Sequence, residues 1–283
     1  MENKSLKQII ANRLEKLDKI RQLGVNPYPY EFNVTCSTSD INKDSVDKKV
    51  SVAGRVMSLR KMGKAAFANI QDANGRVQLY IARDDVGEEN YNLFKLVDIG
   101  DFIGIDGIVF ITKTDALTVK AEKVTVLSKN LRPIPDVKEK DGEKYNSVSD
   151  KELRYRKRYI DMIINPETKD NYIKRFKIIN SIREFLNKNG YIEVETPVLQ
   201  PVYGGANAKP FKTFHNALDQ EFFLRIATEL YLKQLIVGGF EKVYEMSKDF
   251  RNEGIDRSHN PEFTMLEFYQ AYSDYNFMMD FVE

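Results

Sequence analysis

The sequence has 283 residues, with 43 basic and 42 acidic side chains and a formal net charge of +1. That length accommodates two domains, and the even charge balance excludes a global field that attracts nucleic acid, so any basic surface must be local. The single cysteine, Cys36, excludes an internal disulfide. No apolar run approaches about 18 residues and the N-terminus lacks a signal-peptide core, which predicts a cytoplasmic protein with no membrane partner.

Residues 1–48 are predicted to form a helix and a lead-in segment. Between residues 4 and 23 the apolar residues recur at helical spacing, and Gly24 and Pro27 end the pattern. The rest of the helix surface, outside this apolar face, is basic. It suits either RNA phosphate or a solvated face on a helix that packs against the next domain.

Residues 49–128 change to a period of two, which is typical of strands. Val77, Leu79 and Ile81 alternate with polar residues, and Asn74-Gly75 between two such runs is a strong hairpin signal. Three strands, a short helix and two further strands are the element order of the OB-fold, a small barrel that commonly binds oligonucleotides.

The outer face of such a barrel reads unpaired RNA by stacking rings on bases and by hydrogen bonds to base edges. Suitable side chains are Phe67 for stacking, Gln78 and Glu122 for base edges, and Arg55 for phosphate. Alternation alone assigns Phe67 equally well to the barrel core. The residues therefore leave core filling and base stacking open.

Residues 129–152 are charged, contain proline and lack periodicity, so they are predicted to be a linker, and 153–283 a second domain. The second domain opens with RYRKRYIDMI, which suits either an RNA backbone or a hinge helix. An amphipathic helix over 171–189 ends at Gly190 and precedes a strand. Gly204-Gly205 then allows close backbone approach to a ligand, and Glu229 begins a helix, where it either complements the helix dipole or binds a ligand.

The most informative stretch is KVYEMSKDFRNEGIDRSHNPEFTMLEFY, residues 242–269. It is predicted to form two strands joined by a polar loop. Alternation places Glu245, Asp249 and Arg251 on one face of the first strand, and Glu267 and Tyr269 on one face of the second. If these faces coincide, they suit a ligand with an anion, a cation and a flat ring. A surface ladder of ion pairs is the alternative interpretation.

Three stretches resemble one family. FRNEG followed by HNPEFTMLEFY is similar to the second signature motif of class II aminoacyl-tRNA synthetases, in the form found in lysyl-tRNA synthetases. GYIEVETPVLQ resembles the first motif, which builds the dimer interface in that family, and GRVMSLRKMGKAAFANIQDANGRVQLY resembles its anticodon-binding domain. The resemblance implies an α+β chain, in which an OB-fold barrel precedes part of an antiparallel sheet flanked by helices.

The resemblance also implies a role for each matching position. It makes Arg251 the catalytic residue, bridging the lysine carboxylate and the ATP α-phosphate. The implied ATP-binding residues are Arg251, Glu253, His259 and Phe263. The implied lysine-binding residues are Gly205, Glu229, Arg251, Glu267 and Tyr269. The implied anticodon-binding residues are Arg55, Phe67, Gln78 and Glu122.

The implied reaction joins lysine to ATP as lysyl-adenylate, releases pyrophosphate and transfers the lysyl group to tRNA(Lys). It implies Mg²⁺ with ATP, and a homodimer formed through the helix-strand unit of residues 171–200. No third motif of the GxGxGxDR type occurs in the sequence. We therefore expect the metal ligands to lie beyond residue 283 and expect this chain alone to be inactive.

Two other functions are compatible with parts of the pattern. Aspartyl- and asparaginyl-type synthetases share the barrel and much of the HNPEFTMLE wording, but an acidic substrate favours a cation where this chain has Glu229. A non-catalytic tRNA-binding protein built on the OB barrel is favoured by the missing third motif. Adenylate formation separates the enzyme from that alternative.

Overall fold

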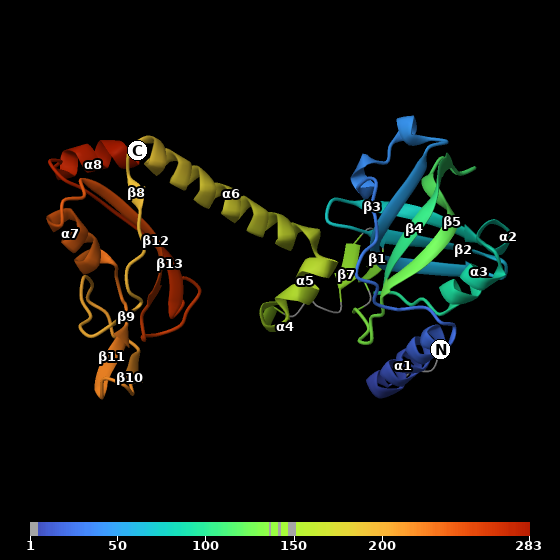
Figure 1. Cartoon of the computed structure of the whole chain (residues 1–283), viewed down its shortest axis with the longest axis horizontal. Helices are drawn as coiled ribbons and strands as arrows, with labels where there is room; N and C mark the ends of the chain where they lie inside the picture. The colour runs from blue at the N-terminus through green and yellow to red at the C-terminus, as the bar shows by residue number, and fades with distance from the viewer. Residues whose placement is uncertain (1–4, 136, 141–142, 147–150) are drawn as a thin grey trace. The chain divides into compact units, whose positions relative to one another are not determined.

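The chain divides after Ile164 into two units in the computed structural model, which describes residues 5–135, 137–140, 143–146 and 151–283 (Figure 1). The first unit contains a closed barrel, and the second contains two three-stranded sheets. The segment predicted to be a linker, 129–152, includes positions 136, 141–142 and 147–150, which lie outside the described residues.

The first helix, α1 (Leu6–Gln22), confirms the helical pattern and begins with a capping box at Ser5. Two of its basic residues turn toward the rest of the same unit. Arg13 is buried and donates to the carbonyl oxygens of Asn130 at 2.6 Å and Ile99 at 3.0 Å, and Lys16 pairs with Asp98. These two cations are therefore used to dock the helix. Two short 3-10 turns, η1 (Thr38–Asp40) and η2 (Lys43–Ser45), follow.

Five strands form the barrel: β1 (Lys49–Met62), β2 (Ala65–Gln71), β3 (Arg76–Ala82), β4 (Phe102–Ile111) and β5 (Leu117–Ser128). They close in the order β1-β2-β3-β5-β4, with only β3 and β5 parallel. The helices α2 (Arg83–Val86) and α3 (Glu88–Lys95) lie between β3 and β4, so the predicted order is confirmed with one additional helical turn. The predicted Asn74-Gly75 turn joins β2 and β3.

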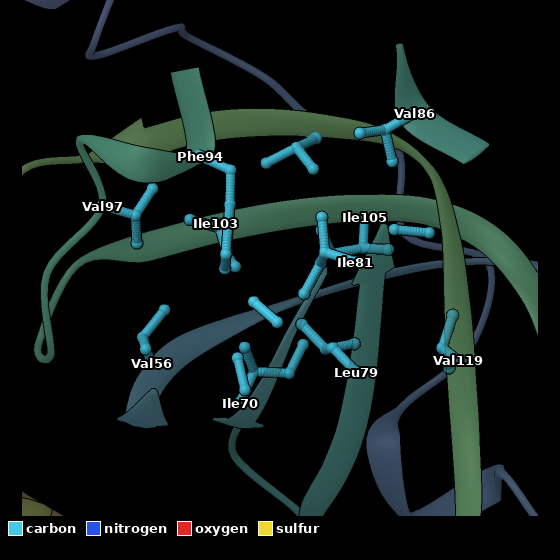
Figure 2. Close-up of a cluster of buried hydrophobic side chains, with 14 of the residues drawn as sticks. Val56, Ile70, Leu79, Ile81, Val86, Phe94, Val97, Ile103, Ile105 and Val119 are labelled. Carbon is cyan, nitrogen blue, oxygen red and sulfur yellow. The ribbon is translucent and has the colours of Figure 1, made fainter. Parts of the chain in front are cut away.

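The barrel core consists of the inward-facing residues of all five strands together with side chains from α2 and α3. Figure 2 shows Val56, Ile70, Leu79, Ile103 and Ile105 converging in the barrel interior. These five side chains have no exposed surface. Burial of this much aliphatic surface is the main stabilising contribution in a small barrel.

Short elements complete the first unit. β6 (Val137–Lys140) and β7 (Glu143–Asn146) pair as an antiparallel hairpin inside the segment predicted to be a linker. They are followed by α4 (Lys151–Arg156) and α5 (Arg158–Ile164). Within the basic stretch, Arg154 and Arg158 both pair with the buried carboxylate of Asp161, at 2.7 and 3.4 Å. Two of its cations are thus held by intramolecular ion pairs.

The second unit begins with the long helix α6 (Pro166–Lys188), which ends before Gly190 as predicted. Its strands are β8 (Ile192–Glu193), β9 (Leu199–Gln200), β10 (Lys212–His215), β11 (Gln220–Leu224), β12 (Lys242–Phe250) and β13 (Glu262–Gln270), with α7 (Glu229–Val237) and α8 (Tyr275–Val282). They form two sheets, ordered β10-β11-β9 and β13-β12-β8. The long strands β12 and β13 are the predicted ribbon and pair antiparallel over nine positions.

The β12/β13 ribbon has two faces of different chemistry. One face packs Tyr244, Leu266 and Phe268 toward α6 and α8, where the side chains leave an apolar groove of about 560 Å³. The other face carries Glu245, Asp249 and Glu267. No helix among the described residues is both long and apolar enough to cross a bilayer.

Candidate active site and candidate nucleic-acid interface

The register of β12 and β13 brings the two predicted polar faces together. Glu245 pairs with Glu267, and Asp249 pairs with Phe263. Directly opposed residues of an antiparallel pair point to the same side of the sheet. The expectation that the two faces coincide is therefore confirmed.

Arg251 lies at the end of β12, where the chain leaves the sheet. Its backbone N–H donates to the Pro261 carbonyl oxygen at 2.9 Å, which closes the base of the 251–261 loop. Its guanidinium lies over the Phe263 ring, 5.0 Å from the ring centroid, and Nε donates to the Ile226 carbonyl oxygen at 3.4 Å. The structure thus brings together an arginine and an aromatic ring, which suit an anionic group and a flat base.

A cluster of two carboxylates and a phenol lies on the same face of the sheet. Glu229 begins α7, and the Tyr269 hydroxyl donates to Glu267 Oε2 at 3.5 Å. Burial raises the pKa of Glu267; the polar groups of Thr228 oppose this, and the nearby charges of Asp249 and Glu229 add to it. Burial and the same two glutamates also raise the pKa of Tyr269 well above its usual range. A cluster of carboxylates of this kind favours a cationic ligand.

Gly205 lies against this acidic cluster in a conformation that requires glycine. Its φ of +83° is in the left-handed region, and a Cβ there would approach the Cβ of Glu229 to 2.8 Å. The close approach keeps the Gly205 backbone beside the Glu229 carboxylate. The structure therefore brings together four of the predicted lysine-site positions, Gly205, Glu229, Glu267 and Tyr269, while Arg251 lies at the end of β12.

Beneath this face is a buried ion cluster that sequence reasoning missed. Arg225 Nη1 donates to Glu245 Oε1 at 2.6 Å and to the Thr196 carbonyl oxygen at 3.0 Å, and Nε lies 3.3 Å from Asp249 Oδ1. Arg225, Glu245 and Asp249 are all buried. Burial raises the pKa of Asp249, against the hydrogen bond from Ser247 and the charge of Arg225. Glu245 and Asp249 are thus the floor of the site, not ligand groups at its surface.

The loop between β12 and β13 contains the two other predicted ATP-binding residues. Glu253 Oε1 accepts from the Lys209 N–H at 3.2 Å, and the Asn252 N–H donates to the Lys209 carbonyl oxygen at 2.7 Å. His259 is exposed and its Nδ1 lies 2.8 Å from Asp256 Oδ2. Hydrogen bonds from the backbone of Ser258 and from His259 hold the pKa of Asp256 below its usual range. Glu253 is therefore anchored to the 209 segment, while His259 is oriented only within its own loop.

In the other unit, Phe67 lies on the outer face of the barrel. Its neighbours in β2, Ala66 and Ala68, point into the core. Phe67 is half-buried against Tyr80, with ring centroids 5.1 Å apart, and Gln78 is held on the same face by the Thr118 hydroxyl, which donates to its Oε1 at 2.9 Å. Phe67 therefore does not fill the core.

The other two predicted RNA contacts lie away from Phe67. Arg55 lies opposite Gln71 in the β1/β2 ladder. Its guanidinium lies 4.2 Å from the Phe102 ring centroid, and burial lowers its pKa. Glu122 is exposed and pairs with Lys49 at 3.3 Å.

The cation opposite Phe67 is Arg60, which sequence reasoning missed. A bulge between Val56 and Ser58 shifts the alternation of β1, so that Arg60 and not Leu59 shares the outer face with Phe67. The extra residue of a bulge gives no clear signal in the sequence.

Comparisons with known proteins find matches for both parts of the chain. Residues 150–283 match the family described as tRNA synthetases class II (D, K and N), and residues 50–127 match the OB-fold nucleic acid binding domain. Residues 150–283 therefore form a class II tRNA synthetase domain of α+β type, and residues 50–127 form an OB-fold barrel.

Within that family, the chain is similar to curated lysine–tRNA ligases. It is 50% identical to that of Carboxydothermus hydrogenoformans, covering 100% of this chain and 57% of the relative. It is 52% identical to one from Porphyromonas gingivalis, over 96% of this chain and 49% of the relative. It is 55% identical to that of Azobacteroides pseudotrichonymphae, over 96% of this chain and 56% of the relative. The chain thus spans about half the length of the curated relatives that it matches.

Proposed function

We propose that this chain carries the anticodon-binding barrel and an amino-acid-activating site of a lysine–tRNA ligase. The reaction is ATP-dependent formation of lysyl-adenylate with release of pyrophosphate, followed by transfer to tRNA(Lys). The observation that carries the proposal is the acidic cluster of Glu229, Glu267 and Tyr269 beside Arg251, on the segment that matches the synthetase family. The proposed limits are 1–48 for the helix and lead-in, 49–128 for the barrel, 129–152 for the linker and 153–283 for the synthetase domain.

Arg251 is the proposed catalytic residue. When the lysine carboxylate attacks the α-phosphate, two anions approach each other, so a fixed positive group stabilises the transition state more than a protein acid or base would. The guanidinium is held by the Ile226 carbonyl oxygen and the Phe263 ring, which preorganises it. Phe263 then offers its ring to adenine, and Glu253 and His259 contact ATP from the loop.

Selection of lysine follows from the negative pocket. The amino group of lysine binds Glu229 and the backbone of Gly205, and Glu267 and Tyr269 line the side-chain pocket. A substrate without a side-chain ammonium leaves a buried carboxylate unpaired, which gives strong rejection. An aspartate substrate meets two like charges, which disfavours the aspartyl-type alternative.

Mg²⁺ belongs to this proposal as part of the Mg–ATP substrate. Among the described residues, no group of three or more His, Cys, Asp or Glu side chains is arranged to hold a metal ion. The charge on the α-phosphate is met by Arg251.

The barrel is the proposed tRNA-binding part. Phe67 stacks on an anticodon base and Gln78 reads a base edge, both on the outer face, with Arg55 and Glu122 at its margins. The proposed compartment is the cytoplasm. A homodimer is proposed through residues 171–200, supported by exposed apolar side chains on α6 and β8, among them Phe176, Ile178 and Ile192.

The proposal is tested by ATP–pyrophosphate exchange with each amino acid in turn. The assay uses protein from the complete reading frame that contains this sequence, beside the 283-residue chain. We expect lysine-dependent exchange from the complete product. Exchange with aspartate or asparagine instead would assign the chain to the sister enzymes, and tRNA binding without any exchange would leave a non-catalytic tRNA-binding protein.

A further inference from the structure

A lysine side chain of this chain already contacts the acidic cluster. Lys233 lies one helical turn after Glu229 on α7, and its Nζ donates to Glu229 Oε1 at 2.5 Å. The same Nζ lies 5.9 Å from the centroid of the Tyr269 ring. An ammonium group on a four-carbon stem thus contacts two of the groups that we assign to the amino-acid substrate.

The surrounding charges explain why a cation is held there. Glu229 and Asp249 lie close enough to Glu267 for their negative charges to raise its pKa. Arg225 lies within ion-pair distance of Glu245 and Asp249, beneath the pocket. Lys233 is therefore the cation that pairs directly with Glu229 in the described part of the chain, and the i,i+4 spacing on α7 brings it within reach.

The exposure of the pair allows it to exchange. The Lys233 side chain retains 56% of its accessible surface and that of Glu229 31%. An exposed lysine on a flexible stem has many accessible rotamers, so its contact with a carboxylate is readily broken. Glu267 and Tyr269, by contrast with Lys233, are only partly exposed.

We propose that Lys233 is a resident counter-cation of the amino-acid pocket, which holds the Glu229 carboxylate until the ammonium group of the incoming lysine replaces it. The inference rests on the proposed function, because it requires that Glu229 bind the substrate ammonium. Lys233 offers the same chemistry as the substrate and keeps Glu229 paired in the empty site. A cation is then exchanged for a cation, and the net charge of the pocket stays unchanged on binding.

The first test is the affinity for lysine of the Lys233→Met variant, measured by isothermal titration calorimetry on protein from the complete reading frame. Methionine keeps an unbranched stem and removes the competing charge. Because an exposed helical ion pair and a weak cation–π contact are lost as competitors, we expect the dissociation constant for lysine to fall about three- to tenfold. Lys233→Arg retains a cation and should remain close to the unsubstituted protein.

Lys19→Met is the matched control. Lys19 pairs with Glu15 at the same i,i+4 spacing, on an exposed part of α1 in the other unit. Its loss should change helix stability by a comparable amount and leave lysine affinity unchanged. A change of equal size in both variants would contradict the inference.

A second measurement separates replacement of Lys233 from a general change in electrostatic potential. Acetylation of Lys233 and Lys19 is compared by mass spectrometry with and without saturating lysine. The ratio of the two modifications cancels the reagent consumed by the free amino acid. If the substrate replaces Lys233, the ratio of Lys233 acetylation to Lys19 acetylation should rise when lysine binds, because the Lys233 amine is released to solvent.

A fixed Lys233–Glu229 pair is the competing model. Glu229 Oε2 faces Gly205, so Lys233 could instead stay on Oε1 and orient the carboxylate for a substrate bound at Oε2. Weaker lysine binding by Lys233→Met, or an unchanged acetylation ratio, would support that fixed arrangement and overturn the inference. If the unsubstituted protein binds no lysine, the proposed function itself fails.

Discussion

In the barrel, inward-facing aliphatic side chains of five strands form one continuous core, in which Val56, Ile70 and Ile105 have no exposed surface. Behind the β12/β13 ribbon, the buried apolar cluster of the described residues contains Leu186, Tyr191 and Tyr244. The opposite face of that ribbon instead buries an arginine and two carboxylates. The interior of the barrel is therefore apolar, whereas the polar face of the ribbon is built on paired charge.

This difference has consequences for what each unit can do. Apolar burial is non-directional, so a barrel tolerates variation in its core and presents its outer face as a separate binding surface. A buried ion cluster is directional, and it fixes the groups attached to it. Arg225 donates to the Lys248 carbonyl oxygen, and its own carbonyl oxygen accepts from the Phe250 N–H, so the cluster fixes the strand that ends at Arg251.

Replacement of Arg225 with alanine tests the charged centre most severely. It leaves Glu245 and Asp249 buried without their cation, and we expect a loss of about 3–5 kcal/mol in the stability of the second unit. Hydrogen exchange resolved by peptide should show lost protection in β12 and β13, with barrel peptides unchanged. Arg183→Ala, which breaks the exposed pair with Glu193, is the control and should have little effect. Equal loss of protection in the barrel would contradict the expectation that this ion cluster stabilises only the second unit.

Replacement of Arg251 with alanine tests the site above that centre. We expect lysine-dependent ATP–pyrophosphate exchange to fall by about 10²–10³-fold or more, because a preorganised charge at the transition state is removed. Binding of tRNA should stay near normal. Lys248→Ala, on the other face of the same strand, should retain exchange. Parallel loss of exchange and tRNA binding in Arg251→Ala would argue against this assignment.

Replacement of Phe67 with alanine tests whether the outer face of the barrel is a separate surface. If Phe67 stacks a base, tRNA binding should weaken by about 1–3 kcal/mol, measured as a dissociation constant at fixed salt. Ile70→Val, in the core of the same strand, should lower the melting temperature only. A lower melting temperature for Phe67→Ala with unchanged tRNA affinity would make Phe67 a structural residue.

The smallest expected effect concerns the β2–β3 turn of the barrel. Asp72 accepts hydrogen bonds from the backbone of Thr38, Asn74 and Gly75, which outweigh its desolvation and lower its pKa to about 2. A depressed pKa in the folded state means that the contribution is present above pH ~4 and is lost as the pH falls toward about 2. We expect about 1 kcal/mol after solvent screening.

The measurement for Asp72 is the stability of the protein and of Asp72→Asn between pH 2 and 6. The stability difference should be largest at the upper end and shrink on acidification. A constant difference across this range would mean that the Asp72 charge has no part in it.

Local patterns predicted the barrel well because each signal is carried by neighbouring residues. Period-two alternation and the Asn74-Gly75 turn are sufficient to position β2 and β3. The β12/β13 ribbon was predictable for the same reason, together with the shared face of Glu267 and Tyr269. The alternation did not distinguish residues that can contact a ligand from the buried residues beneath them, because Glu245 and Asp249 alternate in step with Arg251.

The sequence by itself determined the two-part organisation, the order of the barrel's elements along the chain and the positions that match the synthetase motifs, because these depend on periodicity and local wording. Only the tertiary structure decided which charges are paired. Arg225, Glu245 and Asp249 meet across separate segments, and a bulge turns Arg60 toward Phe67. These pairings depend on register and on side-chain reach in three dimensions, which a linear pattern does not contain.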